Sequence, residues 1–341
     1  MGLAAYGDPA RHRRTSSELV TLAADGGHST ATAWRPDLHE WLSDRLGPVP
    51  VPGGLCQEGA DIAASLQEAL ERAVLHGLDH VLGDVPADRL CLAGGVGLNA
   101  RMNGAILRSN LVKRLFVQPA AGDDGAALGA ALWAQRMAAR GDGEALDGRD
   151  AHGDARGNGI RHTYWGPNGS DDEIRGALAG HSDRLEWSRS RDVAARAARA
   201  LAADRIVGWF QGRMELGPRA LGGRSILASP ASVALRDRLN EAVKGREPFR
   251  PFAPSVLAEA ADRFFEIPDA TAAPYMVVTY RARPEVRSRI PGVVHVDGTS
   301  RVQVVDRDGN PRYHDVLREF ERLTGLPVLL NTSFNRAGEP I

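Results

Sequence analysis

A stretch at residues 138–160 contains almost no large apolar side chain, and it interrupts a chain that is otherwise well supplied with them. It begins AARGDGEALDGRDAHGDARGNG, so Gly, Asp, Arg and Ala dominate it. Such a composition cannot bury enough apolar surface to offset the entropy lost on ordering. It therefore predicts a linker between a first segment, residues 1–137, and a second segment, residues 161–341. The length of 341 residues also exceeds what one ordinary core supports.

The first segment has the pattern of an α/β layer. Apolar residues follow a helical period from Ala60 to Leu82. After them, RLCLAGGVGLNARMNGAIL reads as a short buried strand, a glycine turn and a helix, and RLFVQPAAGDDGAALGAALWAQRMAA repeats that plan. Two consecutive strand–turn–helix units predict strands covered by helices.

The second segment mixes helical and strand patterns. We predict helices in SDDEIRGALAG, RDVAARAARALAAD, SVALRDRLNEAV and YHDVLREFERLTG. Strands rich in β-branched residues are predicted in RIVGWFQG, YMVVTYRAR, VVHVDGTSRVQVVD and LPVLLNTSF. This order predicts an α+β or mixed α/β second domain.

Charge and cysteine content limit the class of protein. The formal net charge is −1, which argues against wholesale nucleic-acid binding and requires any anion site to be local. Cys56 and Cys91 lack a CxxC spacing and are predicted to be free thiols in a reducing cytoplasm. Neither a signal-peptide pattern nor an apolar run of about 18 residues is present, so we expect a cytoplasmic protein that does not enter a membrane.

The segment VKGREPFRPFAP, Val243 to Pro254, concentrates basic residues among prolines. Prolines fix φ and remove N–H donors, so we predict a stiff extended edge or loop. Lys244 and Arg246 would then stand roughly 6–7 Å apart on one side, and Arg250 shares their parity. That spacing suits an extended polyanion such as a triphosphate. A solvated basic loop is the alternative.

The glycine turns of the first segment also allow two interpretations. Gly94, Gly95 and Gly97, followed by Asn99, offer backbone N–H groups to a phosphate at a helix N-terminus. A tight turn without a ligand fits equally well. Asp123 lies at the mouth of the next helix and could hold a metal ion or could simply cap the helix. The pair His76 and His80 has the spacing of helical metal ligands, but both lie off the apolar stripe, so we interpret them as surface residues.

Further polar groups of the second segment occur in three glycine-bearing stretches. These stretches contribute Arg213, Arg219 and Arg224; His295, Asp297 and Arg301; and Asn331, Ser333 and Asn335. Hydroxyl and amide groups at the end of a strand, near Lys and Arg, are what a nucleotide pocket uses to fix phosphate oxygens. Each stretch taken alone could be a turn.

With these residues in view, the sequence resembles the O-carbamoyltransferases of the nodulation-protein U and tobramycin carbamoyltransferase type. The resemblance rests on MGLAAYGDP, LCLAGGVGLNARMN, QPAAGDDGAALGAAL, ELGPRALGGRSILASP, NEAVKGREPFRPFAPSVL, HVDGTSRVQVV and LPVLLNTSFNRAGEPI. These ordered matches lie on both sides of the predicted linker.

The resemblance implies an α/β fold: an incomplete actin/Hsp70-like lobe followed by a YrdC-like α+β domain. In such enzymes the YrdC-like domain makes carbamoyl-adenylate and pyrophosphate from carbamoyl phosphate and ATP, and the other domain passes the carbamoyl group to an acceptor hydroxyl. The implied partners are these small molecules, in natural-product or nodulation-factor tailoring. The implied cofactors are ATP, Mg²⁺ and Fe²⁺.

The resemblance also implies roles for individual residues. Lys244, Arg246, Ser333 and Asn335 resemble phosphate-binding residues of YrdC-like domains, and Arg250 and Asn331 are placed with them. We expect Arg219, Arg224, His295 and Arg301 to line the carbamoyl side. In the first segment the resemblance places Gly94, Gly95, Gly97 and Asn99 at nucleotide phosphates and Asp123 on an iron-type metal.

The sequence departs from the family pattern in ways that bear on activity. In the family, a first actin-like lobe with a His-x-x-x-His pair precedes GLAAYGDP, and a further segment follows GEPI; we expect both to be absent from this chain. Gly223 stands where Asn is common. The first expectation is therefore a carbamoyltransferase or its adenylating portion, in a chain that resembles a fragment and whose partner is a separate first lobe or a second copy of itself. A second is an inactive nucleotide-binding module. A third, RNA binding, conflicts with the near-neutral charge.

Overall fold

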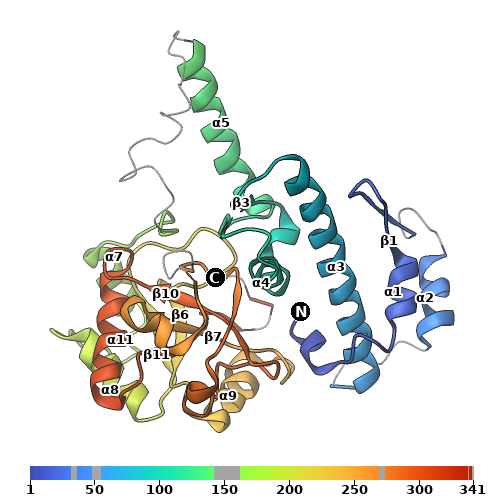
Figure 1. Cartoon of the computed structure of the whole chain (residues 1–341). Helices are drawn as coiled ribbons and strands as arrows, with labels where there is room; N and C mark the ends of the chain where they lie inside the picture. The colour runs from blue at the N-terminus through green and yellow to red at the C-terminus, as the bar shows by residue number, and fades with distance from the viewer. Residues whose placement is uncertain (32–36, 48–54, 142–161, 269–272, 337, 340–341) are drawn as a thin grey trace.

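The computed structural model describes residues 1–31, 37–47, 55–141, 162–268, 273–336 and 338–339. Figure 1 shows a five-stranded sheet on one side of the molecule and the long helix α3 on the other, with the N-terminus between them. The mixed α/β class predicted for the chain is confirmed at this level. In the part of the chain that is described, no helix combines the length and apolarity needed to cross a bilayer.

The second segment is built on that sheet, whose strand order is β10-β7-β11-β6-β5. β10 and β7 are parallel, and the other neighbours are antiparallel. The strands are β5 (Val207–Phe210), β6 (Arg224–Ala228), β7 (Ala253–Leu257), β10 (Gln303–Val305) and β11 (Val328–Ser333). Every residue of β6 and β7 is buried, and apart from Arg224 they are apolar or small, as expected for interior strands.

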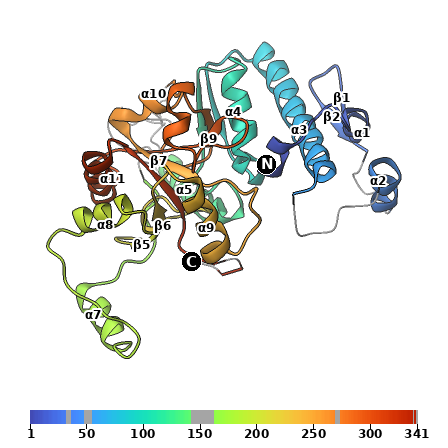
Figure 2. The ribbon, with the colours of Figure 1, turned by 90° about the horizontal axis from the view of Figure 1, so that it is seen from below.

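Helices cover this sheet and join its strands. They are α7 (Asp171–Ala179), α8 (Val193–Ala202), α9 (Val233–Arg238), α10 (Ala261–Phe264) and α11 (Pro311–Thr324). Figure 2 shows α8 and α11 side by side against the sheet, with α7 set apart. The strands predicted in YMVVTYRAR and VVHVDGTSRVQVVD are shorter than expected: β8 (Thr279–Arg281) pairs with β9 (Thr299–Arg301), and tight turns occupy much of the rest.

The first segment has the two predicted strand–turn–helix units. β3 (Arg89–Leu92) and β4 (Arg114–Val117) are parallel, and α4 (Ala100–Arg108) and α5 (Ala126–Gly141) follow them. The predicted Ala60–Leu82 helix is confirmed as α3 (Gln57–Asp84). Before α3 come α1 (Arg13–Leu19), the hairpin of β1 (Val20–Leu22) and β2 (His28–Thr30), and α2 (Leu38–Leu46).

The two segments share one continuous hydrophobic core. Ile106 and Leu115 of the first segment belong to the same buried cluster as Val277 and Phe320 of the second. Asn103, fully buried on α4, donates hydrogen bonds of 2.7 Å to the carbonyls of both Gly97 and Val277. α4 therefore fixes the first segment against the second.

The helix α5 runs into the first residues of the predicted linker, and the linker itself stays a prediction. α5 continues through residues 138–141 because its alanines favour a helix even without large apolar side chains. The rest of the predicted linker, residues 142–160, lies outside the described residues, which resume at residue 162.

The prediction of an extended edge or loop from Val243 to Pro254 is wrong at its start, whereas the end of the segment is extended. A π-helical turn, Leu239–Lys244, carries Lys244, and Gly245 then reverses the chain with φ +54°. Pro254 lies inside β7, where β10 pairs only with residues 255–257, so Pro254 precedes the part of β7 that is paired on both sides. Lys244, Arg246 and Arg250 consequently do not share one face by strand parity.

Candidate functional site

The glycine-rich loop before β6 is held by a buried carboxylate. Glu215 Oε1 accepts hydrogen bonds from the backbone N–H groups of Leu221, at 2.8 Å, and Gly223, at 2.7 Å. Gly222 has φ +102°, and a Cβ there would come within 2.3 Å of the Tyr313 ring. Only glycine meets both conditions, so the loop that presents Arg219 has one fixed conformation.

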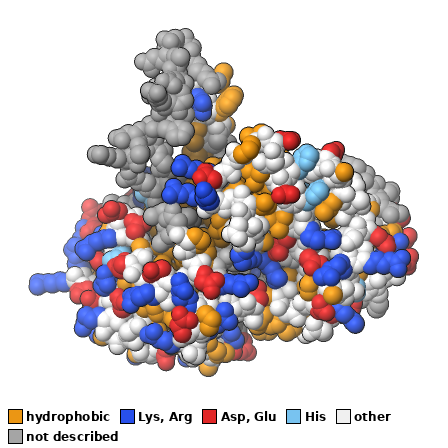
Figure 3. Space-filling model, in the orientation of Figure 1, with side chains coloured by type: hydrophobic (Ala, Val, Ile, Leu, Met, Phe, Trp, Pro, Cys, Tyr) orange, Lys and Arg blue, Asp and Glu red, His pale blue; other side chains and the backbone are white. Residues whose placement is uncertain are grey.

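Next to this loop lies a cavity of about 430 Å³ lined with cationic side chains, here called the arginine cavity. Its basic lining residues are Arg101, Arg219, Arg246, Arg250, Arg301 and His295. Asp297 is the carboxylate that the described residues contribute to its lining. In Figure 3, basic side chains gather near the middle of the face shown, where α4 and the N-terminus lie in Figure 1.

Several guanidinium N–H groups of this cavity are buried without a hydrogen-bond partner among the described residues. They are Nε of Arg219, Nη2 of Arg246 and Nε of Arg301. Burial lowers the pKa of Arg301 well below its usual value, and the charges of Arg219 and Arg246 lower it further. Burial, followed by Arg250, lowers the pKa of Arg246 to about 10. Unpaired buried cations are costly, so this arrangement favours an anionic ligand.

Lys244 lies in a second group, here called the lysine cluster, with Ser333 and Asn335 at the end of β11. Its Nζ is within hydrogen-bonding distance of the Ser333 carbonyl, 2.9 Å, and hydroxyl, 3.2 Å. It also reaches the Asn335 carbonyl, 2.5 Å, and side-chain oxygen, 2.9 Å. The predicted meeting of Lys244 with Ser333 and Asn335 is thus present, but the ammonium holds the chain's own loop.

Arg246 joins the two groups. Its Nε donates to Asn240 Oδ1 at 2.8 Å, and its guanidinium carbon lies 4.4 Å from the Phe252 ring centroid. Burial, followed by the charge of Arg246, lowers the pKa of Lys244 to about 8. The protonation state of Lys244 therefore also affects the binding free energy of an anion that contacts Arg246.

This pKa predicts a pH effect on anion binding. Lys244 loses its proton as the pH rises through about 8, so binding of sulfate, a test anion whose charge stays constant over this range, to the arginine cavity should weaken between pH 7 and pH 9. Isothermal titration at both pH values checks this, with Lys244→Met as the matched variant. An equally steep fall in Lys244→Met would contradict the assignment to Lys244.

His295 enters the arginine cavity from a tight turn that ends at Gly298. Its Nδ1 lies 3.7 Å from Asp297 Oδ1, and its buried Nε2 has no partner among the residues described. Thr299 donates to the same Asp297 oxygen through its backbone N–H, 3.0 Å, and its hydroxyl, 2.7 Å. Burial acts to raise the pKa of Asp297, but the contact with His295 and the hydrogen bonds from Thr299 outweigh it and hold that pKa well below its usual value.

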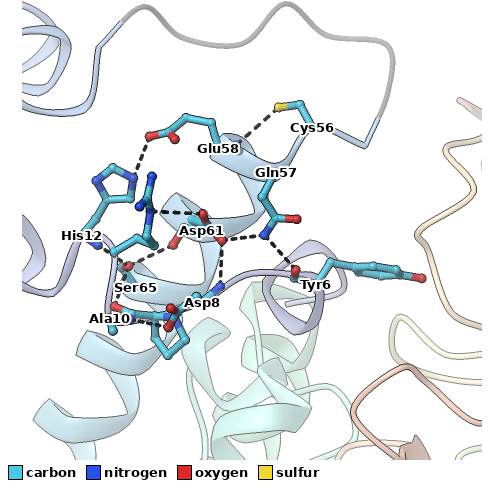
Figure 4. A network of polar contacts seen from close by, with 12 residues as sticks. Tyr6, Asp8, Ala10, His12, Cys56, Gln57, Glu58, Asp61 and Ser65 are labelled. Atoms are coloured by element: carbon cyan, nitrogen blue, oxygen red, sulfur yellow. Dashed lines mark hydrogen bonds and ion pairs between the residues drawn. The ribbon is translucent and has the colours of Figure 1, made fainter.

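The first segment closes one side of the arginine cavity through its N-terminal loop. The Tyr6 ring meets the His295 ring edge-on at 5.5 Å. Figure 4 shows how the loop is held: Asp61 of α3 accepts from the Asp8 N–H at 2.7 Å and from the Gln57 amide at 2.8 Å. Ser65 Oγ donates to the Pro9 carbonyl nearby. A Cβ on Gly7 would collide with the Ala60 backbone, so the approach of loop to helix requires glycine.

The carboxylate of Asp61 predicts acid sensitivity. The hydrogen bond from Asp8 lowers the pKa of Asp61, with Gln57 and Arg11 adding to it against the effect of burial. A lowered folded-state pKa contributes stability above the unfolded value, about 3.9, that is lost as the pH falls through the folded value. Asp61→Asn should therefore lower Tm at pH 7, and the gap to the unsubstituted protein should narrow at pH 3. Asp79→Asn, an exposed carboxylate of α3, is the control; a gap that stays constant with pH would contradict the prediction.

The glycine turns of the first segment meet at one edge of the β3–β4 sheet. Gly94 has φ +95° and donates its N–H to the Ala121 carbonyl at 2.7 Å. The turn at Gly94 and Gly95 is open, whereas Gly97 is buried against Val117 and Ala121. Asn99 caps α4 by accepting from the Met102 N–H, so its side chain has a structural task.

Asp123 lies in the neighbouring turn and is exposed. No group of three His, Cys, Asp or Glu side chains capable of holding a metal ion occurs in the described ranges. The iron site implied by the resemblance therefore does not fit the residues that are described, and we assign Asp123 no metal chemistry. His76 is partly buried rather than free at the surface, since its Nε2 lies 2.7 Å from the Ala23 carbonyl.

Three other predicted site residues lie elsewhere or only at the rim. Arg224 is buried, donates to the carbonyls of Gln211 and Gly212, and stacks on Phe210 instead of lining the arginine cavity. Asn331 is buried inside the sheet, where its amide donates to Ala220, Ser255 and Gln303. Arg250 is at the rim of the cavity, paired with Glu247 at 2.8 Å.

Comparison with known proteins gives the family. Residues 1–132 match the model of the carbamoyltransferase N-terminus, and residues 198–341 match that of the carbamoyltransferase C-terminus. The chain belongs to the carbamoyltransferase family. It is 43% identical to nodulation protein NolO of Bradyrhizobium diazoefficiens over 351 residues, covering 100% of this chain and 60% of that protein.

Other members of the family are similar over shorter shares of their length. Nodulation protein NolNO of Sinorhizobium fredii is 43% identical, over all of this chain and 48% of that protein. Nodulation protein U of S. fredii is 36% identical, over 82% of this chain and 46% of that protein. This carbamoyltransferase-family chain thus spans 60% or less of these relatives.

Sequence reasoning missed the contributions of the first segment to the arginine cavity. Arg101 lines the cavity and Tyr6 contacts its lining residue His295, yet both lie far along the chain from the second segment, and no local pattern links them to it. The one available signal was the conformational demand of the GLAAYGDP glycines, which indicates a loop held in a fixed shape.

Proposed function

We propose that this chain is the adenylating portion of a carbamoyltransferase, with the arginine cavity as its phosphate site. The observation that carries the proposal is the set of buried guanidinium N–H groups on Arg219, Arg246 and Arg301 that have no partner among the described residues. Phosphate oxygens are the acceptors that guanidinium groups bind best, often by two parallel hydrogen bonds. Membership of the carbamoyltransferase family supports carbamoyl phosphate and ATP as the source of those oxygens.

The proposed reaction begins with carbamate, which forms with inorganic phosphate when water hydrolyses carbamoyl phosphate. A carbamate oxygen attacks the α-phosphorus of ATP, the bond to the β-phosphate breaks, and pyrophosphate leaves with the electron pair. The acceptor hydroxyl of a small molecule then attacks the carbamoyl carbon and releases AMP and a proton. The protein's contribution is to hold the negative charge that moves to the leaving group.

The arginine cavity and the lysine cluster have distinct parts in this scheme. Arg219, Arg246 and Arg301 bind the phosphate oxygens, and Lys244 fixes the Ser333–Asn335 loop beside them. His295 presents an unpartnered Nε2 to the cavity and is positioned to orient the carbamate. The lining lacks a carboxylate cluster in the described part of the chain, so Mg²⁺ would enter with the nucleotide as part of the substrate.

The same proposal extends to the fold of each segment. The five-stranded mixed sheet with its cationic loops supports a YrdC-like second segment. The parallel β3–β4 unit with open glycine turns supports a portion of an actin/Hsp70-like lobe that binds nucleotide phosphates at Gly94 and Gly95.

Pyrophosphate release is the direct test. With ATP and carbamoyl phosphate, the purified chain should release pyrophosphate and form carbamoyl-adenylate detectable by mass spectrometry, whereas ATP alone should give neither. Binding of ATP by calorimetry without any carbamoyl-adenylate would overturn the proposed reaction.

One observation favours a second candidate, a nucleotide-binding module that needs a separate α/β lobe. β3 and β4 form a two-stranded parallel sheet in which Cys91 and Phe116 are exposed, although parallel sheets are normally covered on both faces. α5 projects from the body, as Figure 1 shows, and it exposes Leu132, Trp133 and Met137. ATP binding without turnover, restored by an added lobe of a longer relative, would favour this candidate.

A further inference from the structure

Arg101 reaches the arginine cavity from the other segment of the molecule. It lies on the first turn of α4, whereas Arg219, Arg246 and Arg301 all belong to the second segment. Its Nη1 is buried and has no hydrogen-bond partner among the residues described, the same condition as the three guanidinium groups of the second segment. An unpartnered buried donor that faces a cavity indicates a ligand acceptor there.

Two carboxylates flank Arg101. Its Nε lies 3.4 Å from Glu71 Oε1 on α3, and its Nη1 lies 3.7 Å from Asp297 Oδ2 in the second segment. The longer of these is an ion pair without a hydrogen bond, so Nη1 keeps its donor capacity. Glu71 therefore orients the guanidinium group of Arg101 through Nε. Asp297 is too distant to accept a hydrogen bond from Nη1, so that nitrogen can still donate to a ligand.

Glu71 is itself held in place. Gln67 donates to Glu71 Oε1 at 2.9 Å, and the amide of Gln67 pairs reciprocally with that of Asn99 at 3.0 and 3.2 Å. Asn99 directly follows the glycine turn of the first segment and caps α4. The guanidinium of Arg101 thus sits at the end of a chain of polar contacts that is anchored on the turn.

We propose that Arg101 is a binding residue of the arginine cavity, donated by the first segment and aimed by Glu71 at the same anion that Arg219, Arg246 and Arg301 contact. The inference rests on the proposed function, because it assumes that the cavity binds phosphate groups. It adds that the anion site is complete only when the two segments are docked through α4.

Titration with inorganic pyrophosphate tests this inference on the whole chain. Arg101→Gln should weaken pyrophosphate binding roughly 10-fold, the loss expected for one charge-assisted contact. Arg101→Lys should restore it only partly, because an ammonium lacks the planar fork that directs one edge of the guanidinium to Glu71 and another to the anion. Arg72→Gln is the matched control: it removes the same charge from neighbouring α3, where Arg72 bonds Ser17. Binding by Arg72→Gln should stay within about 2-fold of the unsubstituted chain.

Glu71→Gln separates aiming from general electrostatics. If Arg101 acts only through its field, removing the negative charge of Glu71 should tighten pyrophosphate binding. If Glu71 aims Arg101, the same substitution should weaken binding by about 3-fold or more. Tighter binding in Glu71→Gln, or unchanged binding in Arg101→Gln, would overturn the inference.

The outcomes for the two proposals differ. Pyrophosphate binding that depends on Arg101, in a chain that forms no carbamoyl-adenylate, keeps this inference and removes the proposed reaction. Pyrophosphate release that is unaffected by Arg101→Gln keeps the proposed reaction and removes the inference about Arg101. An unsubstituted chain that binds no pyrophosphate would overturn both.

Discussion

Arg246→Ala is expected to reduce carbamoyl-phosphate-dependent pyrophosphate release by at least about 100-fold, the loss typical of removing one preorganised charge contact in a reactive site. Arg246 lines the arginine cavity, and its charge also acts on Lys244 of the lysine cluster. Asn240 fixes its Nε at 2.8 Å, Phe252 supports its face, and its buried Nη2 is left for the substrate. A lysine at this position would not replace Arg246, because its ammonium lacks the planar guanidinium that contacts Asn240, Phe252 and the substrate at once.

The control for this prediction is Arg263→Ala, an arginine of α10 that is largely exposed and paired with Glu321. Pyrophosphate release by the control should match the unsubstituted chain in a coupled colorimetric assay. Lys244→Ala should also abolish release, because the Ser333–Asn335 loop loses the ammonium that holds it. Release by Arg246→Ala within about 3-fold of the unsubstituted chain would contradict the assignment.

The second large effect concerns stability. Arg301→Met is expected to raise the Tm of the ligand-free protein by roughly 2–6 °C while removing its response to pyrophosphate. The guanidinium of Arg301 has a buried, unpartnered Nε and is crowded by Arg219 and Arg246, which is why its pKa is lowered. Methionine of similar length removes the unpaired charge and keeps apolar contacts.

Thermal unfolding with and without pyrophosphate checks the higher Tm of the ligand-free variant and the loss of its response to pyrophosphate. At a concentration of 100 Kd, a ligand that binds only the folded state adds about 2.7 kcal/mol, which the unsubstituted chain should show and Arg301→Met should not. Arg213→Met, an exposed arginine outside the cavity lining, is the control and should leave both readings unchanged. A destabilised Arg301→Met that still responds to pyrophosphate would contradict the proposed cost of the cation cluster.

The local architecture could be predicted from the sequence because its causes are local. Glycine turns and apolar periods specify β3–α4, β4–α5 and α3, and each is present with nearly the predicted bounds. The failure at Val243–Pro254 also has a local cause: prolines restrict only their own φ and that of the preceding residue, and they did not determine the path of Lys244. A π-helical turn places Lys244 against the end of β11 instead.

The composition of the site could be predicted only in part. Lys244 and Ser333 were recognised by residue type, and tertiary contacts then decided which of the candidates face one cavity. Arg224 and Asn331 have suitable chemistry, yet backbone carbonyls and the buried network of the sheet already occupy them. Arg101 enters through packing of α4 against the second segment, and one-dimensional spacing carries no information on that contact.

Isotope exchange between labelled pyrophosphate and ATP tests most directly whether the arginine cavity supports carbamoyl adenylation. The exchange requires that carbamoyl-adenylate form reversibly and that pyrophosphate return to the same cations. We expect label to enter ATP only when carbamoyl phosphate is supplied, and to remain at background in Arg246→Ala. Label entering ATP equally without carbamoyl phosphate, or no exchange by a chain that binds both ATP and pyrophosphate, would contradict the central claim.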